Sequence, residues 1–571
     1  RQTKAEKGYK PDSGVTAQIK VIARLFNGSE QIVVATDAGR EGELIFRYLY
    51  HYIGCSTPFV RLWISSLTDK AIREGLRNLE NGSKYDNLFL AAKARSESDW
   101  LVGINGTQAL TIAAGHGTYS VGRVQTPTLG MVCERYWENR RFTPEAFWQL
   151  HIAVDGNNDG TVKLSSSGKW KEKEPATALY NKVKEAGTAT VTKAERKEKT
   201  EDTPLLYDLT TLQKEANAKH GFTAEQTLEI AQKLYEKKLV TYPRTGSRYI
   251  PDDVFAEIPK LLAFIGAMPE WQGKVQEKAG PTRRSVDGGK VTDHHALLVT
   301  GEKPLFLSKE DNTVYQMIAG RMIEAFSEKC VKDTTTVTAE CAGAEFTVKG
   351  SVIRQAGWRA VYGEEDKEEI SIPDWQEGDT LTLKGCSITE GKTKPKPLHT
   401  EATLLSAMET AGKEVEDDAL RQALKDCGIG TPATRAAIIE TLFKRGYMER
   451  CKKSLVPTEK GLALYSIVKT MRIADVAMTG DRGVHEGDYL GTALMRQALR
   501  PQGFRLQVSQ VRNGNDAVLR QGRPLRQCGV RTARFPSEGK PYPLRRGDQR
   551  PAYRRAHETA KRLQEQAGQK L

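Results

Sequence analysis

The chain has 571 residues, which is too long for one hydrophobic core and predicts three to five domains. Its apolar fraction of 39% and charged fraction of 28% are ordinary for a globular protein. No apolar run reaches the ~18 residues that cross a bilayer, and no signal-peptide pattern opens the chain, so the composition argues against a membrane or secreted protein. The net charge of +14 favours a polyanionic partner. Most of this charge lies in 481–571, where sixteen Arg and three Lys against eight acidic residues give a net charge of +11.

The eight cysteines are scattered singly along the chain, and none forms a Cys-x-x-Cys pair. A zinc ribbon or a dithiol redox motif is therefore not indicated. Reduced, mostly buried thiols in a cytosolic protein are the expected state.

In chain order, a helix is expected first at Ala17–Leu25 and a buried strand next at Gln31–Thr36. The Ile-Val-Val-Ala core of this strand is too short and too β-branched to prefer a helix. An acidic turn over Asp37–Arg40 and a helix over Glu41–Tyr50 complete an α/β unit. Open α/β sheets place their sites at the carboxyl ends of strands, so this turn is a candidate site.

Helical and strand-like periodicities then alternate along the rest of the chain. The patterns are helical over 70–137, 210–239 and 400–470. They are strand-like over 147–200 and 331–390, which lie between the helical stretches. A glycine-rich loop, Gly115–Gly122, interrupts the first helical stretch. This order implies that the chain leaves a helical region and returns to it, and it predicts discontinuous domains.

Tyr242 is a candidate nucleophile. Pro243 biases it towards an extended conformation, and in an extended segment Arg244 shares its side of the chain. A phenol has a pKa near 10, and a cationic neighbour favours the phenolate and stabilises charge on a phosphoryl oxygen. Taken alone, the tripeptide fits a Tyr-Pro turn with a surface arginine better than it fits an active site.

The stretch Thr241-Tyr-Pro-Arg-Thr-Gly-Ser247 resembles the active-site segment of type IA DNA topoisomerases, T-Y-P-R-T-D-S, with Gly246 in the place of Asp. The resemblance implies that Tyr242 attacks a DNA phosphodiester and becomes linked to the 5′ phosphate, while Arg244 steadies that phosphate. The free 3′ hydroxyl later reverses the step. The bond energy stays in the phosphotyrosine, so no nucleotide cofactor is required.

The acidic turn is similar to the TOPRIM motif of this family, D-x-D-x-E-G-E. Asp37 and Glu41 fill its first and third positions, and Gly39 replaces the second Asp. The resemblance implies Mg²⁺ at Asp37 and Glu41, since Mg²⁺ prefers oxygen ligands, with one carboxylate fewer than usual. Helix capping and compensation of the helix dipole explain these acids equally well in isolation.

Two further motifs point to DNA binding. Ser120–Leu129 resembles S-x-G-R-V-Q-[ST]-P, which implies that Arg123 and Gln125 grip DNA. Just upstream, Arg95–Asn105 matches R-x-x-x-D-W-L-x-G-x-N and adds Arg95. The simpler explanation of Ser120–Leu129 is a glycine turn before a helix that starts at a proline. The simpler explanation of Arg95–Asn105 is a structural ion pair.

Two later motifs complete the ordered set. Thr292–Ala296 matches [DA]-H-[HE]-A, which implies a phosphate contact by His294, although paired histidines more often indicate a metal site or a buried hydrogen bond. Gly428–Tyr447 resembles the G-I-G-T-P-[AS]-T-R helix, whose N-terminus can bind phosphate beside Thr434 and Arg435. A winged-helix reader of duplex DNA would show a similar helix.

The resemblance covers roughly residues 10–480 and is closest to the bacterial topoisomerase III branch. It implies a multidomain fold that combines α/β, α and β parts, in which a partial TOPRIM domain, helical domains and a β-arch form the type IA toroid. It also implies a monomer that acts on single-stranded DNA in the bacterial cytoplasm, near the nucleoid or a plasmid. The expected domains are partial TOPRIM 1–60, helical 61–145 with 396–480, β-rich arch 146–205 with 300–395, nucleophile 206–299 and a basic tail 481–571.

Two departures from the family qualify this prediction. The family begins with a strand that carries a catalytic Glu-Lys pair, whereas Glu6-Lys7 lies here in a polar stretch after no expected strand, so the pair is not assigned and an N-terminal truncation is expected. Beyond Gly480 arginine far exceeds lysine and apolar periodicity fades. A disordered basic tail and a frameshifted terminus both explain this, and the composition favours the frameshift.

The favoured function is ATP-independent strand passage with Mg²⁺. One alternative is a catalytically impaired DNA-binding accessory protein that holds single strands through Arg123, His294 and Arg435. Another is a TOPRIM nuclease or primase that uses Asp37 and Glu41, which leaves Tyr242 unexplained. A covalent adduct at Tyr242 separates the three.

Overall fold

The computed structural model describes residues 2–5, 8–115, 117–156, 160–275, 281–363, 371–411 and 428–476. All of them belong to one compact unit of the chain. Glu6-Lys7 and the basic tail 481–571 lie outside the described residues, so the predictions made for them are not tested.

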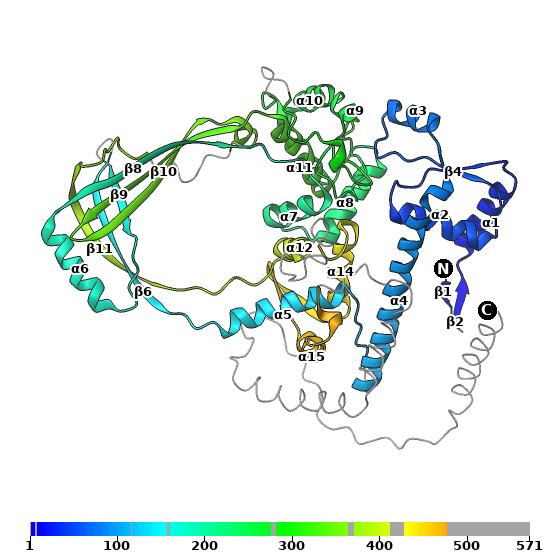
Figure 1. The fold of residues 1–571 in the computed structure, drawn as a ribbon, viewed down its shortest axis with the longest axis horizontal. Coiled ribbons are helices and arrows are strands. Elements are labelled where there is room, and N and C mark those ends of the chain that lie inside the picture. The colour runs from blue at the N-terminus through cyan, green and yellow to red at the C-terminus, as the bar shows by residue number, and fades with distance from the viewer. Residues whose placement is uncertain are drawn as a thin grey trace. The chain divides into compact units, whose positions relative to one another are not determined.

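The N-terminal part is a small α/β unit (Figure 1). Its elements are β1 (Gln2–Ala5), β2 (Gly8–Pro11), α1 (Ser13–Asn27), β3 (Ile32–Val34), α2 (Arg40–Ile53), β4 (Phe59–Arg61), α3 (Asp69–Arg77) and β5 (Glu80–Asn81). The sheet has the order β3-β4-β5, in which β3 and β4 are parallel and β4 and β5 antiparallel, while β1 and β2 form a separate hairpin. The predicted strand, acidic turn and helix are confirmed. A strand does precede Glu6-Lys7, contrary to the prediction.

One helical core is built from two distant stretches of the chain. The first contributes α4 (Asp86–Ala114) and α5 (Gln125–Arg141). The second contributes α12 (Glu401–Thr410), α14 (Pro432–Lys444), β12 (Met448–Cys451), β13 (Ser454–Pro457) and α15 (Glu459–Val468). Leu129 and Cys133 from the first stretch pack in one buried cluster with Leu405, Ile439 and Leu464 from the second. The predicted return of the chain to a helical region is therefore observed.

A second core surrounds the segment that carries Tyr242. It contains α7 (Leu209–His220), α8 (Ala224–Glu236), α9 (Asp252–Phe255), α10 (Ile258–Gly266) and α11 (Lys309–Phe326). Much of α11 is buried, including the run from Met317 to Phe326. The short 3₁₀ helices of the described residues are Gly82–Tyr85, Pro269–Trp271, Gly288–Lys290, Gly357–Val361 and Arg472–Ala474.

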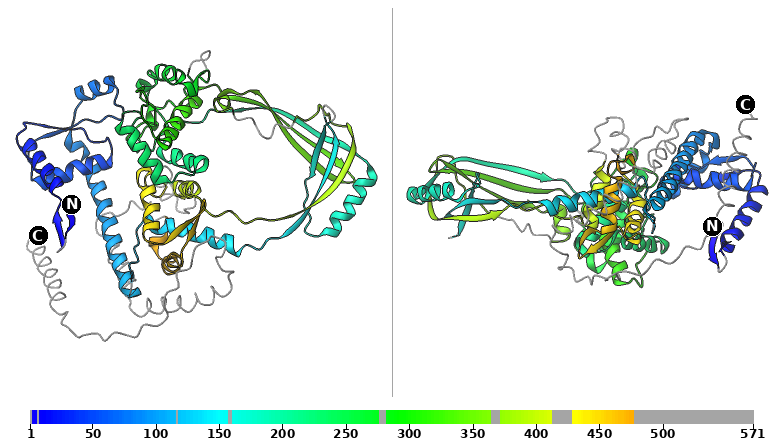
Figure 2. Two further views of the ribbon diagram at one scale, coloured as in Figure 1. Left: turned by 180° about the vertical axis from the view of Figure 1, so that it is seen from behind. Right: turned by 90° about the horizontal axis from the view of Figure 1, so that it is seen from below.

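The strand-rich regions form one closed barrel, with the order β10-β7-β6-β11-β8-β9. Its strands are β6 (Ala146–Asp155), β7 (Thr161–Ser166), β8 (Thr188–Glu201), β9 (Cys330–Cys341), β10 (Ala344–Gln355) and β11 (Thr380–Lys392). A helix, α6 (Lys173–Ala186), interrupts a stretch for which the pattern predicts strands only, and it lies against β6 and β11 (Figure 2). Ala176, Leu179, Tyr180 and Val183 form its packing face at helical spacing.

Among the described helices, none has the length and apolar content needed to cross a membrane. Five described cysteines are free thiols: Cys55, Cys133, Cys330, Cys341 and Cys386. Cys451 is disulfide-bonded, which departs from the expectation of reduced thiols.

Candidate active site

Tyr242 lies on an extended segment that neighbouring backbone holds in place. The segment follows α8 through Lys238, which has a positive φ of 61°. The amide of Thr241 donates to the Leu298 carbonyl at 2.9 Å, and the amide of Leu298 donates to the Thr241 hydroxyl oxygen at 3.0 Å. Leu298 is buried in the core around α11, so the position of the tyrosine is tied to that core.

The Tyr242 side chain is half-buried among aromatic rings and charges. Its ring centroid lies 4.5 Å from that of His294 and 5.3 Å from that of Tyr235. Burial raises the pKa of the Tyr242 phenol, the negative charge of Asp37 raises it further, and the positive charge of Arg244 opposes both. Arg244 is exposed. The predicted nucleophile, its arginine and the first acid of the TOPRIM-like motif therefore share one electrostatic environment.

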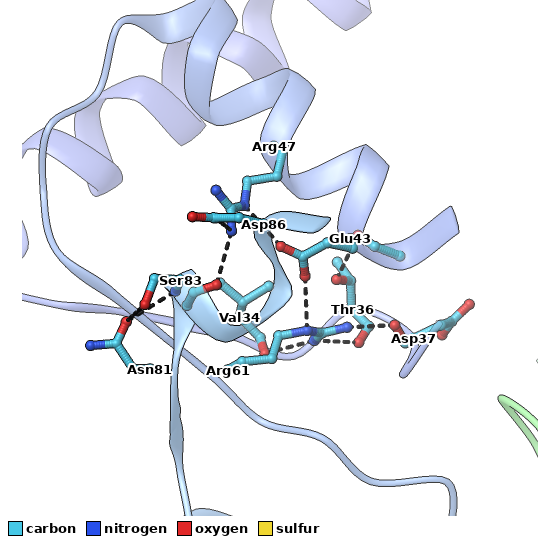
Figure 3. Close-up of polar contacts among 11 residues, drawn as sticks. Val34, Thr36, Asp37, Glu43, Arg47, Arg61, Asn81, Ser83 and Asp86 are labelled. Atoms are coloured by element: carbon cyan, nitrogen blue, oxygen red, sulfur yellow. Dashed lines mark hydrogen bonds and ion pairs between the residues drawn. The ribbon is translucent and has the colours of Figure 1, made fainter. Parts of the chain in front are cut away.

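The acidic loop between β3 and α2 is held from behind by a buried guanidinium (Figure 3). Arg61, at the end of β4, is 1% exposed. Its Nη1 donates to the carbonyls of Val34 at 2.9 Å and Thr36 at 2.7 Å, and its Nη2 donates to the carbonyl of Asp37 at 2.5 Å. These bonds fix the backbone that delivers the Asp37 carboxylate. The side chain of Asp37 is 54% exposed, and Glu41 is also exposed to solvent.

A buried carboxylate balances the charge of Arg61. Glu43, also 1% exposed, faces Arg61 Nε at 3.2 Å through Oε2, as an ion pair without hydrogen-bond alignment. Its other oxygen accepts from Arg47 Nε at 2.8 Å, and Arg47 Nη2 continues to Asp86 at 2.7 Å (Figure 3). The last acid of the TOPRIM-like motif is therefore structural. It pairs two arginines that anchor the loop and α4.

The loop also closes tightly on the first turn of α2. A Cβ atom on Gly42 would overlap the backbone oxygen and nitrogen of Asp37, so only glycine fits there. The Thr36 hydroxyl donates to the Gly42 carbonyl at 2.8 Å. The G-E pair of the motif therefore has a packing function.

His294 joins the acidic loop to the nucleophile segment. Its Nε2 lies 3.5 Å from Asp37 Oδ2, and its ring stacks at a tilt on Tyr242. The Thr245 hydroxyl donates to the His294 carbonyl at 2.8 Å. Of the paired histidines, His295 is held differently: its Nδ1 lies 2.8 Å from the Ala296 carbonyl, and burial lowers its pKa.

The start of α14 lies beside the segment that follows Tyr242. A Cβ atom on Gly246 would lie 3.1 Å from Cγ of Pro432, the first residue of α14. Thr431 and Thr434 form a reciprocal capping box. Arg435 is 2% exposed, because its guanidinium is turned inward and donates to the Thr210 hydroxyl at 3.0 Å and to the Ile429 carbonyl at 3.2 Å. In this conformation Arg435 cannot contact DNA, and it links α14 to α7 instead.

The remaining predicted DNA-binding residues lie on α4 and at the start of α5. Arg123 Nε forms a short ion pair with Asp99, and its side chain is 10% exposed. The Gln125 amide donates to the Ser120 carbonyl at 3.1 Å and to its hydroxyl at 3.0 Å, and Arg95 is half-buried on α4. Gly430 connects this loop to α14, because its Cβ position lies 3.3 Å from both Val124 and Arg435. The described contacts bring this group next to α14 and do not bring it to Tyr242.

Sequence reasoning misses two residues of the site. Arg61 lies in an unremarkable Val-Arg-Leu-Trp stretch, and only its burial reveals its contacts. Asp293 stands within the histidine motif without a role of its own, yet its carboxylate lies against Gly39 in the acidic loop.

Comparison with known proteins gives a consistent result. Residues 83–482 match the family model described as DNA topoisomerase. The chain is 39% identical over 455 residues to DNA topoisomerase 3 of Bacillus subtilis (strain 168), which covers 77% of this chain and 62% of that protein. It is 34% identical over 540 residues to DNA topoisomerase 3 of Bacillus anthracis, covering 90% and 72%. The chain thus spans 62% to 72% of the length of these relatives.

The fold is also similar to that of a solved structure. Full-length topoisomerase I from Thermotoga maritima superimposes with a TM-score of 0.65 at 22% identity, covering 90% of this chain and 83% of the other. The likeness concerns the fold alone. Because the family model matches residues 83–482 and the relatives are DNA topoisomerases 3, the chain belongs to the type IA DNA topoisomerase family and is similar to topoisomerase III within it.

Proposed function

We propose that the chain cleaves and rejoins single-stranded DNA through a 5′-phosphotyrosyl intermediate at Tyr242, and passes strands through the break without ATP. The Tyr242 oxygen forms a bond to phosphorus, and the bond from phosphorus to the 3′ oxygen breaks. The leaving 3′ oxygen gains a proton, and the phenol loses one. The observation that supports the proposal is the position of Tyr242. Its ring lies beside that of His294, and the charges of Arg244 and Asp37 are close enough to shift the pKa of its phenol.

The chain's own charges suit this reaction. The raised pKa keeps the Tyr242 phenol protonated at neutral pH, so the proton must leave as the oxygen attacks. Arg244 opposes that rise and can stabilise negative charge on the phosphate. His294, whose ring contacts that of Tyr242, can donate a hydrogen bond to a phosphate on the same side as the acidic loop.

We assign Asp37 and Glu41 to the binding of Mg²⁺. Both carboxylates are exposed on a loop whose backbone Arg61 fixes, and hard oxygen donors suit this ion. Within the described ranges, no three acidic, His or Cys side chains already converge as ligands. Mg²⁺ usually keeps several of its waters, so a site with few carboxylates fits it. When bound, the ion would supply positive charge for the DNA phosphate.

For the DNA path, we propose contacts from Thr434 at the start of α14 and from His294. Arg123, Gln125 and Arg95 would contact a strand after Arg123 exchanges its Asp99 partner for phosphate. Arg435 would contact DNA only if α14 moved away from α7. A sequence-independent grip of this kind, with phosphate contacts from several elements, suits an enzyme that cuts single strands.

We also propose the domain division 1–60, 61–145 with 396–480, 146–205 with 300–395, and 206–299, with 481–571 as a basic tail on a monomer. In this proposal the TOPRIM-like part and the barrel belong to a type IA toroid. Support comes from the fold likeness to a full-length topoisomerase I and from the helical core that joins α4 and α5 to α12, α14 and α15. The core around Tyr242 also includes α11, so it favours moving 309–326 from the β-rich part to the part that carries the nucleophile.

The test is to trap the covalent intermediate. A single-stranded oligonucleotide labelled at its 3′ end should become attached to the wild-type protein on denaturation in the presence of Mg²⁺. Tyr242→Phe should abolish the adduct, whereas Tyr235→Phe, which changes the neighbouring ring, should retain most of it. DNA binding without an adduct in the wild type would instead support an accessory protein, and cleavage that survives Tyr242→Phe would support a metal-dependent nuclease.

A further inference from the structure

Asp253 lies on the short helix α9, which is packed into the core around Tyr242. Ile250 just before the helix is 0% exposed, and Val254 within it is 5% exposed. Both side chains belong to the same buried cluster as Val240, which leads into the segment that carries Tyr242. The Ile250 amide also donates to the Ser285 carbonyl at 2.9 Å. The backbone that presents Asp253 is therefore part of the core that positions Tyr242.

The carboxylate of Asp253 contacts the N-terminal α/β unit. Its Oδ2 accepts from the Ser66 hydroxyl at 2.8 Å and from the Thr68 hydroxyl at 2.7 Å. Ser66 is 5% exposed. The Thr68 hydroxyl oxygen also accepts from the Ala71 amide at 3.2 Å and thereby caps α3. One carboxylate oxygen of the Tyr242 core is thus bonded to a buried serine and to the start of α3.

These two hydroxyls follow the strand that holds the acidic loop. Arg61, the last residue of β4, donates to three carbonyls of that loop, and the Leu62 amide donates to the Val34 carbonyl at 3.0 Å. Ser66 and Thr68 come a few residues later in the same stretch. The stretch is therefore attached to the acidic loop at one end and to Asp253 at the other.

The charge of Asp253 strengthens this contact. Burial raises the pKa of its carboxyl group, but the hydrogen bonds from Thr68 and Ser66 outweigh burial and hold the pKa below its usual value. The carboxylate is therefore ionised at neutral pH, and hydrogen bonds to a charged acceptor are roughly twice as strong as neutral ones. None of the described hydrogen bonds or ring contacts joins Asp253 to Tyr242, so any effect on the nucleophile is indirect.

We propose that Asp253 is a positioning residue for strand cleavage, which holds the acidic loop opposite Tyr242 through Ser66 and Thr68. The inference rests on the proposed function. In that reaction the 5′ end is bonded to Tyr242, and the cut ends are rejoined only while the two parts of the site stay together. Water can replace two hydroxyl–carboxylate hydrogen bonds at a modest net cost, so the contact favours the closed arrangement and still allows the cut ends to separate for strand passage.

The test compares adduct formation with rejoining. Asp253→Asn keeps the shape of the side chain but removes its charge. The equilibrium ratio of Tyr242 adduct to uncut 3′-labelled oligonucleotide should increase roughly tenfold, and rejoining should slow by a similar factor, because the cut ends separate more easily. A merely structural role predicts the opposite direction, since loss of folded protein would lower both the adduct level and the relaxation of supercoiled plasmid. Thermal unfolding of each variant measures that loss.

Asp252→Asn is the matched control. It removes the same charge from the same helix, but at an exposed carboxylate that pairs with Arg283, and it should leave the adduct level unchanged. Ser66→Ala should raise the adduct level in the otherwise wild-type protein and should have no further effect in Asp253→Ala, because both changes break one contact. A wild-type adduct level in Asp253→Asn would overturn the proposal. A fall in adduct and relaxation together, or additive effects of Ser66→Ala and Asp253→Ala, would also overturn it.

Failure of the proposed function would look different. Amide hydrogen exchange of residues 62–72 in the DNA-free protein, measured by mass spectrometry, should be faster in Asp253→Asn than in the wild type or in Asp252→Asn. If the wild type gave no DNA adduct but this exchange still depended on Asp253, strand cleavage would fail while the link between the two parts would stand. If the adduct formed and the exchange was the same in Asp253→Asn and wild type, the role of Asp253 alone would fail.

Discussion

At the scale of single residues, the proposed chemistry depends on opposing charges around Tyr242. Burial and Asp37 raise the pKa of the phenol, and the positive charge of Arg244 lowers it. A higher pKa means less phenolate at a given pH. In the DNA-free chain the phenol is therefore kept neutral. In the proposed cleavage, positive charge beside the scissile phosphate would have to offset this.

Replacing Arg244 tests this balance. Arg244→Gln should raise the pKa of Tyr242 further. The rate of adduct formation, which increases as the phenol ionises, should then increase only at a higher pH than in the wild type. The rate at neutral pH should fall roughly 100-fold, as it does when one stabilising donor is removed from a developing anion. Titration of ¹³C-labelled tyrosine by nuclear magnetic resonance measures the pKa directly. Arg248→Gln, a nearby exposed arginine, is the control, and an unchanged Tyr242 pKa in Arg244→Gln would contradict the argument.

At the scale of elements, α12 begins beside a buried histidine. His399 is 5% exposed, its Nδ1 lies 3.2 Å from the Thr403 hydroxyl, and its carbonyl accepts from the Leu455 amide at 2.7 Å. Burial, with help from the charge of Arg135, lowers the pKa of His399 to about 4. The neutral ring thus belongs to the packing between α12 and the β12–β13 hairpin.

This histidine should make the helical core sensitive to acid. The pKa of His399 is lower in the folded state than in the unfolded chain. The neutral ring therefore makes its full contribution to the free energy of unfolding above about pH 6.5, the pKa of the unfolded state. That contribution is lost as the pH falls towards 4, and it amounts to roughly 3 kcal/mol. His399→Gln should reduce the difference in urea midpoint between pH 7 and pH 4.5. An unchanged pH dependence in that variant would show that other groups cause the acid sensitivity.

The sequence predicts elements well where local pattern and tertiary packing agree. The strand before Asp37 and the helix from Thr223, whose hydroxyl caps the Gln226 amide at 3.0 Å, are examples. Prediction fails at α6, because Ala176, Leu179 and Val183 lie between strands of a barrel and their helical spacing is hidden in a strand-like context. The sequence also does not show that Arg435 faces inward or that Asp293 reaches Gly39, since both depend on contacts between distant segments.

At the scale of the whole molecule, each major core joins stretches that are far apart in the chain. Leu110 and Leu129 pack with Leu404 and Ile439, and Leu206 packs in one cluster with Val361. The barrel likewise combines β6 to β8 with β9 to β11. The active-site segments are therefore brought together only when these long-range cores are complete.

Charge is distributed unevenly over the same chain, since +11 of the net +14 lies in 481–571. A variant that ends at Gly480 should bind single-stranded DNA less tightly at low salt. The slope of log affinity against log salt should become shallower by about 0.7 for each phosphate that the shortened protein no longer neutralises. Fluorescence anisotropy with an oligonucleotide over a salt series measures both. The same slope with and without the tail would contradict a DNA-binding contribution from this region.

The grip of Arg61 on the acidic loop has a consequence for which ions the loop can accept. The Val34 carbonyl accepts from both Arg61 and the Leu62 amide, and the Asp37 carbonyl accepts from both Arg61 and the Gly39 amide. Main-chain oxygens at these two positions are thus saturated, and side-chain oxygens are left for a cation. Ca²⁺ draws on six to eight ligands, including carbonyls, whereas Mg²⁺ keeps its water. At the proposed cation site, Asp37 and Glu41 would therefore offer side-chain oxygens and not these two main-chain oxygens, and we expect the loop to bind Mg²⁺ in preference to Ca²⁺.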